Sequence, residues 1–206
     1  LDSPPLCDEH TPIQAYTGAP YMDTKALSER RVLDAWARGG VPAVVIRPGD
    51  VYGPGSQPWV LRPLQMMRRG LPLLVGGGHG LMVHCWIDNL VDALVLAIDK
   101  EGIEGDVFHI SDGADDTSFR AYFERLARAG KTKLSPISIP FSVAETLGLG
   151  FDFLSAHVPI SPPFSATAVR YMKRRSRYSM ESSRQVLGYQ PKVSLEEGME
   201  RLAAHI

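Results

Sequence analysis

The chain has 206 residues, with 22 basic and 23 acidic side chains and a formal net charge of −1. This length can bury a sizeable core, and the near-neutral charge gives no global attraction to nucleic acid or to an anionic membrane. No stretch approaches the roughly 20 apolar residues of a membrane span, and the start, LDSPPLCDEH, lacks the features of a signal peptide. We therefore expect a cytoplasmic protein with no membrane span and no nucleic-acid partner.

The cysteines and histidines do not have the spacing of a metal site. Cys7 and Cys85 stand far apart, which favours two reduced thiols. His79, His84 and Cys85 match no standard zinc pattern, and neighbouring residues of a strand point to opposite faces. We expect no bound metal.

The first elements predicted along the chain are a loop, a helix and a buried strand. Residues 1–20 are rich in proline and glycine and show no periodicity. Residues 23–40 place apolar side chains at helical spacing and end in two glycines. The short apolar run 43–46 is bounded by turn residues, as in a strand covered on both faces of a parallel sheet. These parts are typical of a doubly wound α/β domain.

The rest of the chain continues this alternation. In order, we expect a helix at 59–70, a strand at 71–75, a strand running into a helix over 83–102, a strand at 106–113, an amphipathic helix at 118–130, and two short helices within 178–206. Asp88 is the expected N-cap of its helix. GGGHG, residues 76–80, is expected to form a hairpin-like turn, because no helix follows it to make a phosphate cradle.

The pentapeptide YMDTK, residues 21–25, contains the strongest candidate for chemistry. Tyr21 and Lys25 lie four residues apart on a predicted helix, so their side chains are neighbours on one face. A lysine ammonium beside a phenol favours the phenolate and lowers the tyrosine pKa. Such a tyrosine can act as a general acid/base near neutral pH. Because chance alone gives this spacing in roughly one such chain in five, the surrounding sequence must decide.

Several ordered motifs around this pair resemble one family. They are DEHTPIQ followed by Tyr-x-x-x-Lys, then RPGDVYGPG, VHCWIDNLVDALVLA, FHISDG and LGYQPKVSLEEGM. Together they are similar to the extended branch of the short-chain dehydrogenase/reductases, the NAD-dependent epimerase/dehydratase superfamily. Within this branch, the chain looks most like the 3β-hydroxysteroid dehydrogenase and dihydroflavonol reductase side.

The resemblance implies the C-terminal portion of a doubly wound, Rossmann-like parallel sheet domain with a smaller, mostly α substrate lobe. Residues 1–56 and 81–113 would belong to the dinucleotide-binding domain. Residues 57–80 and 114–206 would form the substrate lobe.

The resemblance also implies roles for individual residues. Tyr21 would be the catalytic acid/base, and Lys25 would lower its pKa and bind the nicotinamide ribose of NAD or NADP. Pro48, Gly49, Asp50 and Val51 would lie beside the nicotinamide, mainly through backbone contacts.

Three features of the family are not found in this sequence. They are the glycine-rich dinucleotide fingerprint, the residue that recognises the adenosine ribose, and the catalytic serine or threonine. We expect them upstream of Leu1, in roughly the N-terminal third of the family fold. We therefore expect the 206-residue chain alone to be inactive, and the protein to form a homo-oligomer, most simply a dimer.

The implied function is NAD(P)-dependent oxidation or reduction of a secondary alcohol or ketone on an apolar, steroid- or flavonoid-like small molecule. One alternative is a nucleotide-sugar epimerase or dehydratase, for which Arg62, Arg68 and Arg69 could bind a pyrophosphate. Another is a non-catalytic, dinucleotide-sensing relative, which would not need Tyr21 and Lys25 in register.

Two further segments have open interpretations. The apolar segment 137–165 is interrupted by Pro140, Pro159, Pro162 and Pro163, so it cannot be one long helix. Its aromatic and aliphatic residues could equally form core or the wall of an apolar substrate pocket. The basic run KRRSR, residues 173–177, is expected to be a solvated face rather than a phosphate site.

Overall fold

The computed structural model describes residues 4–113, 116–158 and 164–206. Within these residues the strands form four pairs, and every pair is parallel. The pairs are β1 (Leu6–Cys7) with β8 (Arg177–Tyr178), β2 (Val45–Pro48) with β6 (Val107–Ile110), β3 (Asp50–Tyr52) with β5 (His84–Trp86), and β4 (Leu74–Val75) with β7 (Ser138–Ile139). The fold class is therefore α/β, as predicted.

Strands β2 and β3 are consecutive, and the chain changes its partner strand at Gly49. The amide of Gly49 still donates to the carbonyl of Ile110 on β6, at 2.9 Å, whereas the amide of Asp50 donates to the carbonyl of Val83, just before β5, at 2.5 Å. A Cβ at Gly49 would lie 2.1 Å from the Val83 carbonyl oxygen. Only glycine allows this close approach, so the PGD sequence lets one extended segment join two strand pairs.

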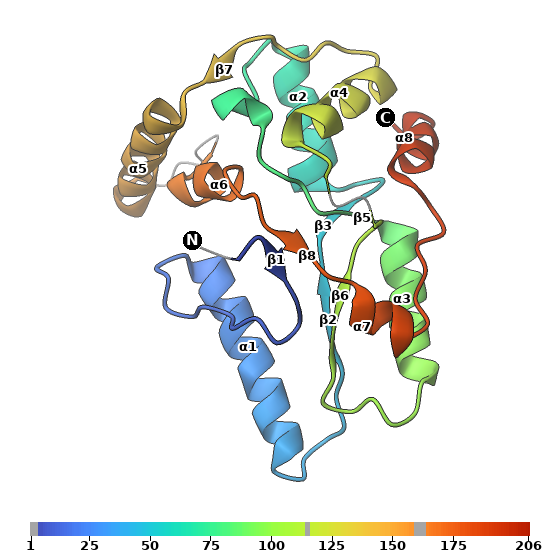
Figure 1. Ribbon diagram of the computed structural model, residues 1–206. Coiled ribbons are helices and arrows are strands. Elements are labelled where there is room, and N and C mark those ends of the chain that lie inside the picture. The colour runs from blue at the N-terminus through green and yellow to red at the C-terminus, as the bar shows by residue number, and fades with distance from the viewer. Residues whose placement is uncertain (1–3, 114–115, 159–163) are drawn as a thin grey trace.

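Helices lie on either side of the β2–β6 pair, as expected for a doubly wound sheet (Figure 1). One of them is α1 (Pro20–Ala37), and the other is α3 (Ile87–Asp99). Ala93 of α3 shares a buried cluster with Phe108 and Ile110 of β6. The apolar runs in the strands and the apolar face of α3 account for this packing.

The remaining helices form the lobe at the top of Figure 1 and the C-terminal segment. They are α2 (Arg62–Arg68), which follows a π-helical turn at Gln57–Leu61, α4 (Phe119–Ala129), α5 (Phe141–His157), α6 (Ala166–Tyr171), α7 (Glu181–Gln185) and α8 (Leu195–Ala203). A large buried cluster joins α2, α4 and α8 to Tyr52 of β3 and Trp86 of β5. Ser118 caps α4 by accepting from the amide of Ala121 at 3.1 Å, which fits the predicted amphipathic helix.

The start of α3 corrects one prediction. Asp88 is not the N-cap, because strand β5 leads directly into the helix, which begins at Ile87 with Trp86 at the cap position. Asp88 lies in the first turn, where an acidic side chain suits the helix dipole. Its carboxylate accepts from the indole nitrogen of Trp86 at 2.9 Å and pairs with Arg201 at 3.3 Å.

The glycine-rich segment 76–80 corrects a second prediction. It is a tight turn, but not a hairpin, because β4 pairs in parallel with the distant strand β7. Gly76, Gly77 and Gly78 all have positive φ angles, of 54°, 75° and 71°. A Cβ at Gly80 would lie 1.9 Å from the carbonyl oxygen of Met172. The glycines therefore serve the turn and its packing against the lobe.

Helix α5 starts directly after Pro140, and Pro159, Pro162 and Pro163 lie outside the described residues. None of the helices in the described part of the chain is long and apolar enough to cross a membrane. Cys7 and Cys85 are both free thiols, as predicted. The described residues contain no cluster of histidine, cysteine and acidic side chains that could hold a metal.

Candidate active site

Helix α1 brings the predicted pair together on one exposed face. The helix begins at Pro20, whose fixed φ suits a first helical position. The carboxylate of Asp23 holds the preceding loop by accepting from the amide and hydroxyl of Thr17, both at 2.7 Å. Tyr21 is 75% exposed, and the ammonium of Lys25 lies 5.8 Å from the centroid of its ring. The phenol is thus accessible, with a positive charge beside it.

The segment 48–51, called the loop 48–51 below, runs from the last residue of β2 through Gly49 into β3. Its one ionisable side chain, that of Asp50, faces inward. Pro48 is exposed and Gly49 is partly exposed, whereas Asp50 is buried. The Asp50 carboxylate accepts a hydrogen bond from Arg174 at 2.6 Å and another from the hydroxyl of Tyr171. Burial raises the pKa of Asp50, and the Arg174 guanidinium opposes that rise. A cofactor at this loop would therefore meet backbone and apolar atoms, not a free carboxylate.

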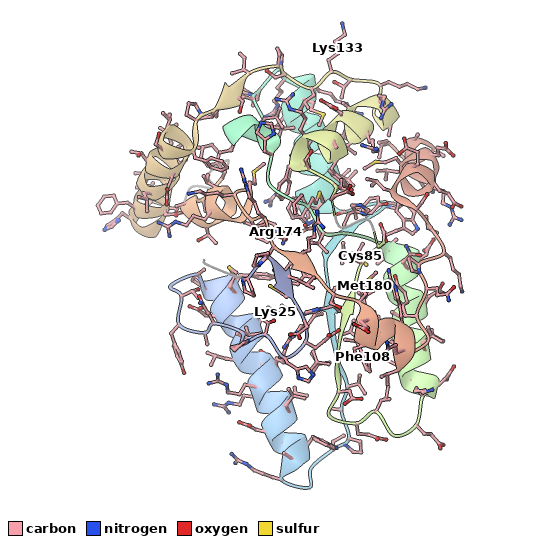
Figure 2. The ribbon with its side chains drawn as sticks, viewed as in Figure 1. Lys25, Cys85, Phe108, Lys133, Arg174 and Met180 are labelled. Atoms are coloured by element: carbon pink, nitrogen blue, oxygen red, sulfur yellow. The ribbon has the colours of Figure 1, made fainter. Side chains whose placement is uncertain are left out.

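Arg174 corrects the prediction of a solvated basic face. Lys173, Arg175 and Arg177 are exposed, but the guanidinium of Arg174 lies 4.1 Å from the centroid of the Tyr171 ring. It also donates to the carbonyl of Leu81 at 2.9 Å. Figure 2 shows Arg174 on the chain that runs from α6 into β8, where the lobe meets the strands. Arg174 turns inward because a buried carboxylate needs an opposite charge.

A different ion pair, between Arg47 and Glu29, connects α1 to the sheet. Arg47, the residue before Pro48, donates to both oxygens of Glu29, from Nε at 2.9 Å and from Nη2 at 2.6 Å. The two side chains are 19% and 14% exposed. Neither residue was predicted to matter, although Glu29 stands four residues after Lys25 and Arg47 directly precedes the loop 48–51.

The motif VHCWIDN is explained by a buried hydrogen-bond network. The carboxylate of Asp112 accepts from the His84 ring at 2.8 Å, the Trp86 amide at 2.7 Å and the Asn89 side chain at 2.7 Å. Asn89 also donates to the carbonyl of Val193 at 2.7 Å. The network ties β5, α3, the end of β6 and the C-terminal segment together. His84 and Asn89 are therefore structural residues, and sequence analysis did not identify Asn89 or Asp112.

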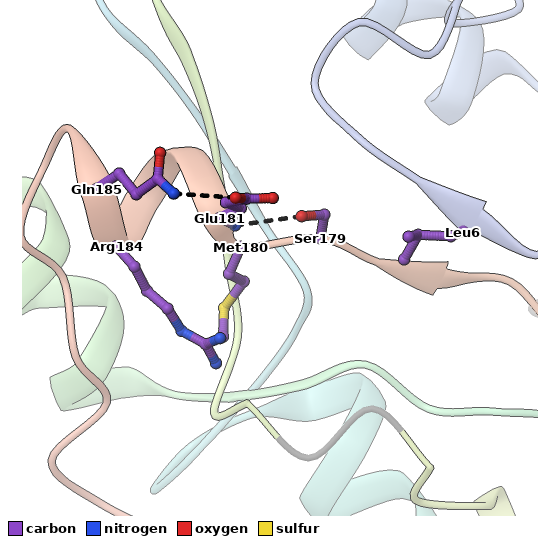
Figure 3. Close-up of a pocket in the computed structure, with 6 residues that line it drawn as sticks. All are labelled: Leu6, Ser179, Met180, Glu181, Arg184 and Gln185. Atoms are coloured by element: carbon purple, nitrogen blue, oxygen red, sulfur yellow. Dashed lines mark hydrogen bonds between the residues drawn. The ribbon is translucent and has the colours of Figure 1, made fainter.

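Two hollows among the described residues do not contain the predicted pair. The first, of about 440 Å³, is lined by Leu6, Ser179, Met180, Glu181, Arg184 and Gln185 (Figure 3). The second, of about 500 Å³, lies between the end of α2 and residues 132–136. Tyr21 and Lys25 stand outside both, on an open surface.

The sequence of this chain matches one family model over most of its length. The model is that of the 3-beta hydroxysteroid dehydrogenase/isomerase family, and the match covers residues 3–141. The chain belongs to this family. Its resemblance to extended short-chain dehydrogenase/reductases is thereby confirmed.

Curated relatives of this family member include two oxidoreductases. The 2-alkyl-3-oxoalkanoate reductase of Stenotrophomonas maltophilia is 32% identical, over 90% of this chain and 58% of its own length. The decarboxylating sterol-4-alpha-carboxylate 3-dehydrogenase of Mus musculus is 27% identical, over 88% of this chain and 52% of its own. The chain thus spans only a little more than half the length of these relatives.

Solved structures with a similar fold include two epimerases. The UDP-glucose 4-epimerase of Thermotoga maritima matches with a TM-score of 0.63 at 25% identity, over 90% of this chain and 52% of its own. The UDP-glucuronic acid 4-epimerase of Bacillus cereus, solved with NAD, gives a TM-score of 0.68 at 20% identity, over 97% of this chain and 54% of its own. These likenesses confirm the Rossmann-like fold.

Proposed function

We propose that the whole protein is an NAD(P)-dependent oxidoreductase that acts on a secondary alcohol or ketone of a largely apolar small molecule. The observation that carries this proposal is the pair on α1: an exposed phenol, Tyr21, with the Lys25 ammonium 5.8 Å from its ring. A non-catalytic relative would have no need of this arrangement. Membership of a dehydrogenase family supports the same reading.

In this proposal the chain's own residues handle the proton. The Tyr21 hydroxyl gives its proton to the carbonyl oxygen during reduction, and takes it from the hydroxyl during oxidation. The Lys25 ammonium favours the phenolate form and binds the nicotinamide ribose. NAD or NADP, when bound, supplies or takes up the hydride. The loop 48–51 would contact the nicotinamide through backbone atoms, because the Asp50 carboxylate is engaged by Arg174 at 2.6 Å.

The division of the chain into two parts belongs to this proposal. Residues 1–56 and 81–113 would complete the dinucleotide-binding domain, and residues 57–80 and 114–206 the substrate lobe. The position of α1 and α3 on either side of β2 and β6 supports the first assignment (Figure 1). The helices α2, α4, α5 and α6 support the second.

The surface of α5 favours an apolar substrate. Its two acidic residues turn toward α6: Glu145 pairs with Arg170 at 2.6 Å, and Asp152 accepts from the amide of Ala166 at 3.1 Å. Exposed aliphatic and aromatic side chains remain, namely Val143, Leu147, Leu149, Phe153 and Leu154. The names of the two relatives, a sterol carboxylate dehydrogenase and an alkyl-oxoalkanoate reductase, also describe substrates with large apolar parts.

The arginines of α2 and of its C-cap do not support a pyrophosphate-bearing substrate. Arg62, Arg68 and Arg69 are all exposed. Arg62 and Arg68 lie at opposite ends of the helix, and six residues of α-helix span about 9 Å. Their exposure and spacing thus give no specific support for a shared phosphate site. A nucleotide-sugar epimerase remains the second candidate because the 25% identical structural neighbour is a UDP-glucose epimerase.

A substrate panel separates these two candidates. The longest natural form of the protein would be mixed with NADH or NADPH and either apolar ketones, including 3-oxo acids, or UDP- and dTDP-sugars. We expect oxidation of the reduced cofactor with the ketones alone. Sugar interconversion without net cofactor consumption would favour the epimerase instead.

A further inference from the structure

Helix α1 is attached to the rest of the chain by few side chains. None of its residues is buried. Trp36, near its C-terminal end, packs against Gly105, where a Cβ would lie 2.3 Å from the indole. Glu29, in the middle of the helix, forms the two-pronged ion pair with Arg47. Apart from the bonds of Asp23 to Thr17 and Gly18 just before the helix, this ion pair is the polar attachment of α1 nearest in sequence to Tyr21 and Lys25 among the described residues.

The positions of the two residues along the sequence give this ion pair a specific geometry. Tyr21, Lys25 and Glu29 are spaced four residues apart, so they follow one face of α1. Arg47 lies on β2 and directly precedes the loop 48–51. An arginine fork on a carboxylate fixes both distance and orientation, which a single contact cannot do.

Other ionisable groups surround the pair. Arg47 Nη1 donates to the main-chain carbonyl of Glu9 at 3.3 Å and lies 3.3 Å from Nε2 of His109. The Glu9 carboxylate accepts from the His109 amide at 3.1 Å and lies 3.9 Å from its ring nitrogen Nδ1. Burial lowers the pKa of His109, although the negative charge of Glu9, and more weakly that of Asp8, opposes this. A neutral imidazole leaves Arg47 as the cation that faces Glu29.

We propose that Glu29 and Arg47 are a positioning pair that aligns the Tyr21–Lys25 face of α1 with the loop 48–51 and neutralises the carboxylate of Glu29. The alignment matters for catalysis only if Tyr21 and Lys25 have the roles proposed above. The effect of the Glu29 charge on Lys25 does not depend on those roles. Without Arg47, the Glu29 carboxylate would stand one turn from Lys25 and attract its ammonium away from the phenol.

The charge effect can be measured without any turnover, because the tyrosines of this chain differ in burial. Burial raises the pKa of five tyrosines, namely Tyr52, Tyr122, Tyr171, Tyr178 and Tyr189. Tyr16 is 80% exposed and can be removed by Tyr16→Phe. In that background, the first tyrosinate absorbance to appear on raising the pH should report Tyr21.

The experiment compares substitutions of the pair in the Tyr16→Phe chain. With Arg47→Met, we expect the Tyr21 titration to move up by about 0.3 pH units, the size of an exposed pair interaction four residues apart. Adding Glu29→Gln should restore the original titration. Arg30→Met, which removes the same charge from an exposed position of α1, should give a smaller shift, and adding Glu29→Gln should not reverse it. A titration unchanged by Arg47→Met, or unrestored by Glu29→Gln, would overturn the neutralising role.

The alignment is tested separately by Arg47→Lys, which keeps the charge but loses the fork. We expect the amides of α1 to exchange with deuterium several-fold faster while the Tyr21 titration is unchanged. Equal exchange in wild type and Arg47→Lys would overturn the alignment. Both measurements use the protein without cofactor or substrate. A failure of the positioning role is therefore distinct from a failure of the proposed reaction, which is measured by turnover.

Discussion

Arg174 donates a 2.6 Å hydrogen bond to the carboxylate of Asp50, across 124 residues of sequence. The Asp50 side chain is 5% exposed and that of Arg174 is 16% exposed. The pair therefore joins the loop beside the proposed nicotinamide site to the lobe in a nearly dry environment. Because an arginine does not lose its charge in a protein, the carboxylate cannot be removed without leaving a buried cation.

Asp50→Asn should destabilise the protein strongly for this reason. We expect a loss of about 3 kcal/mol in the free energy of unfolding, as for other broken buried ion pairs. Asp92→Asn is the matched control, because Asp92 pairs with Lys192 at 2.8 Å on the surface, with exposed fractions of 37% and 74%. That change should cost less than about 1 kcal/mol. Urea denaturation measures both changes in the free energy of unfolding. Equal losses would show that the Asp50–Arg174 pair stabilises the fold no more than a surface ion pair does.

Replacing the adjacent residues Asp88 and Asn89 by alanine should lower stability by very different amounts. Asn89→Ala removes the donor to Asp112 and all the contacts of Asn89 with residues 192–193. We expect it to cost about 2–4 kcal/mol, because several buried polar groups lose their partners together. Asp88→Ala, on the exposed side of the same turn, should cost less than about 1 kcal/mol. Thermal and urea unfolding of the two variants would decide, and a larger loss for Asp88→Ala would contradict the network described here.

Two of the phenylalanines of α5, Phe151 and Phe153, separate the core from the proposed pocket wall. Phe151 packs edge-to-face against Phe164, with ring centroids 5.4 Å apart, whereas Phe153 is 70% exposed. Phe151→Ser should therefore lower stability. Phe153→Ser should leave the unfolding midpoint nearly unchanged and raise the KM for an apolar ketone. If Phe153→Ser changes neither stability nor KM, this face of α5 takes no part in substrate binding.

Sequence patterns predicted those features that depend on neighbouring residues. The spacing of Tyr21 and Lys25 placed them on one helix face, and the short apolar run 43–46 indicated the strand β2, which lies at Val45–Pro48. Both features are local, so the spacing of residues carries the information. The expectation that this strand is covered on both faces was wrong, since its residues are only partly buried or exposed.

Long-range polar pairing was not predictable in the same way. A run such as KRRSR suggests solvent, and nothing local shows that Arg174 meets an aspartate 124 residues earlier. The signal that was available is Asp50 itself, since a carboxylate at the end of a buried strand needs a partner. Likewise, local capping preference suggested Asp88 as the N-cap of α3. The buried carboxylate that contacts the start of this helix is instead Asp112, which accepts from the Asn89 side chain.

The central claim, that Tyr21 carries the proton, is tested most directly by Tyr21→Phe in the longest natural form of the protein. The measurement is kcat/KM for an apolar ketone with NADH or NADPH, alongside the Kd of the cofactor. We predict a fall of about 10²- to 10⁴-fold in kcat/KM with the Kd nearly unchanged. Lys25→Met should lower activity and also weaken cofactor binding, and Tyr16→Phe should change neither. A Tyr21→Phe protein that keeps more than half of its activity would contradict the claim.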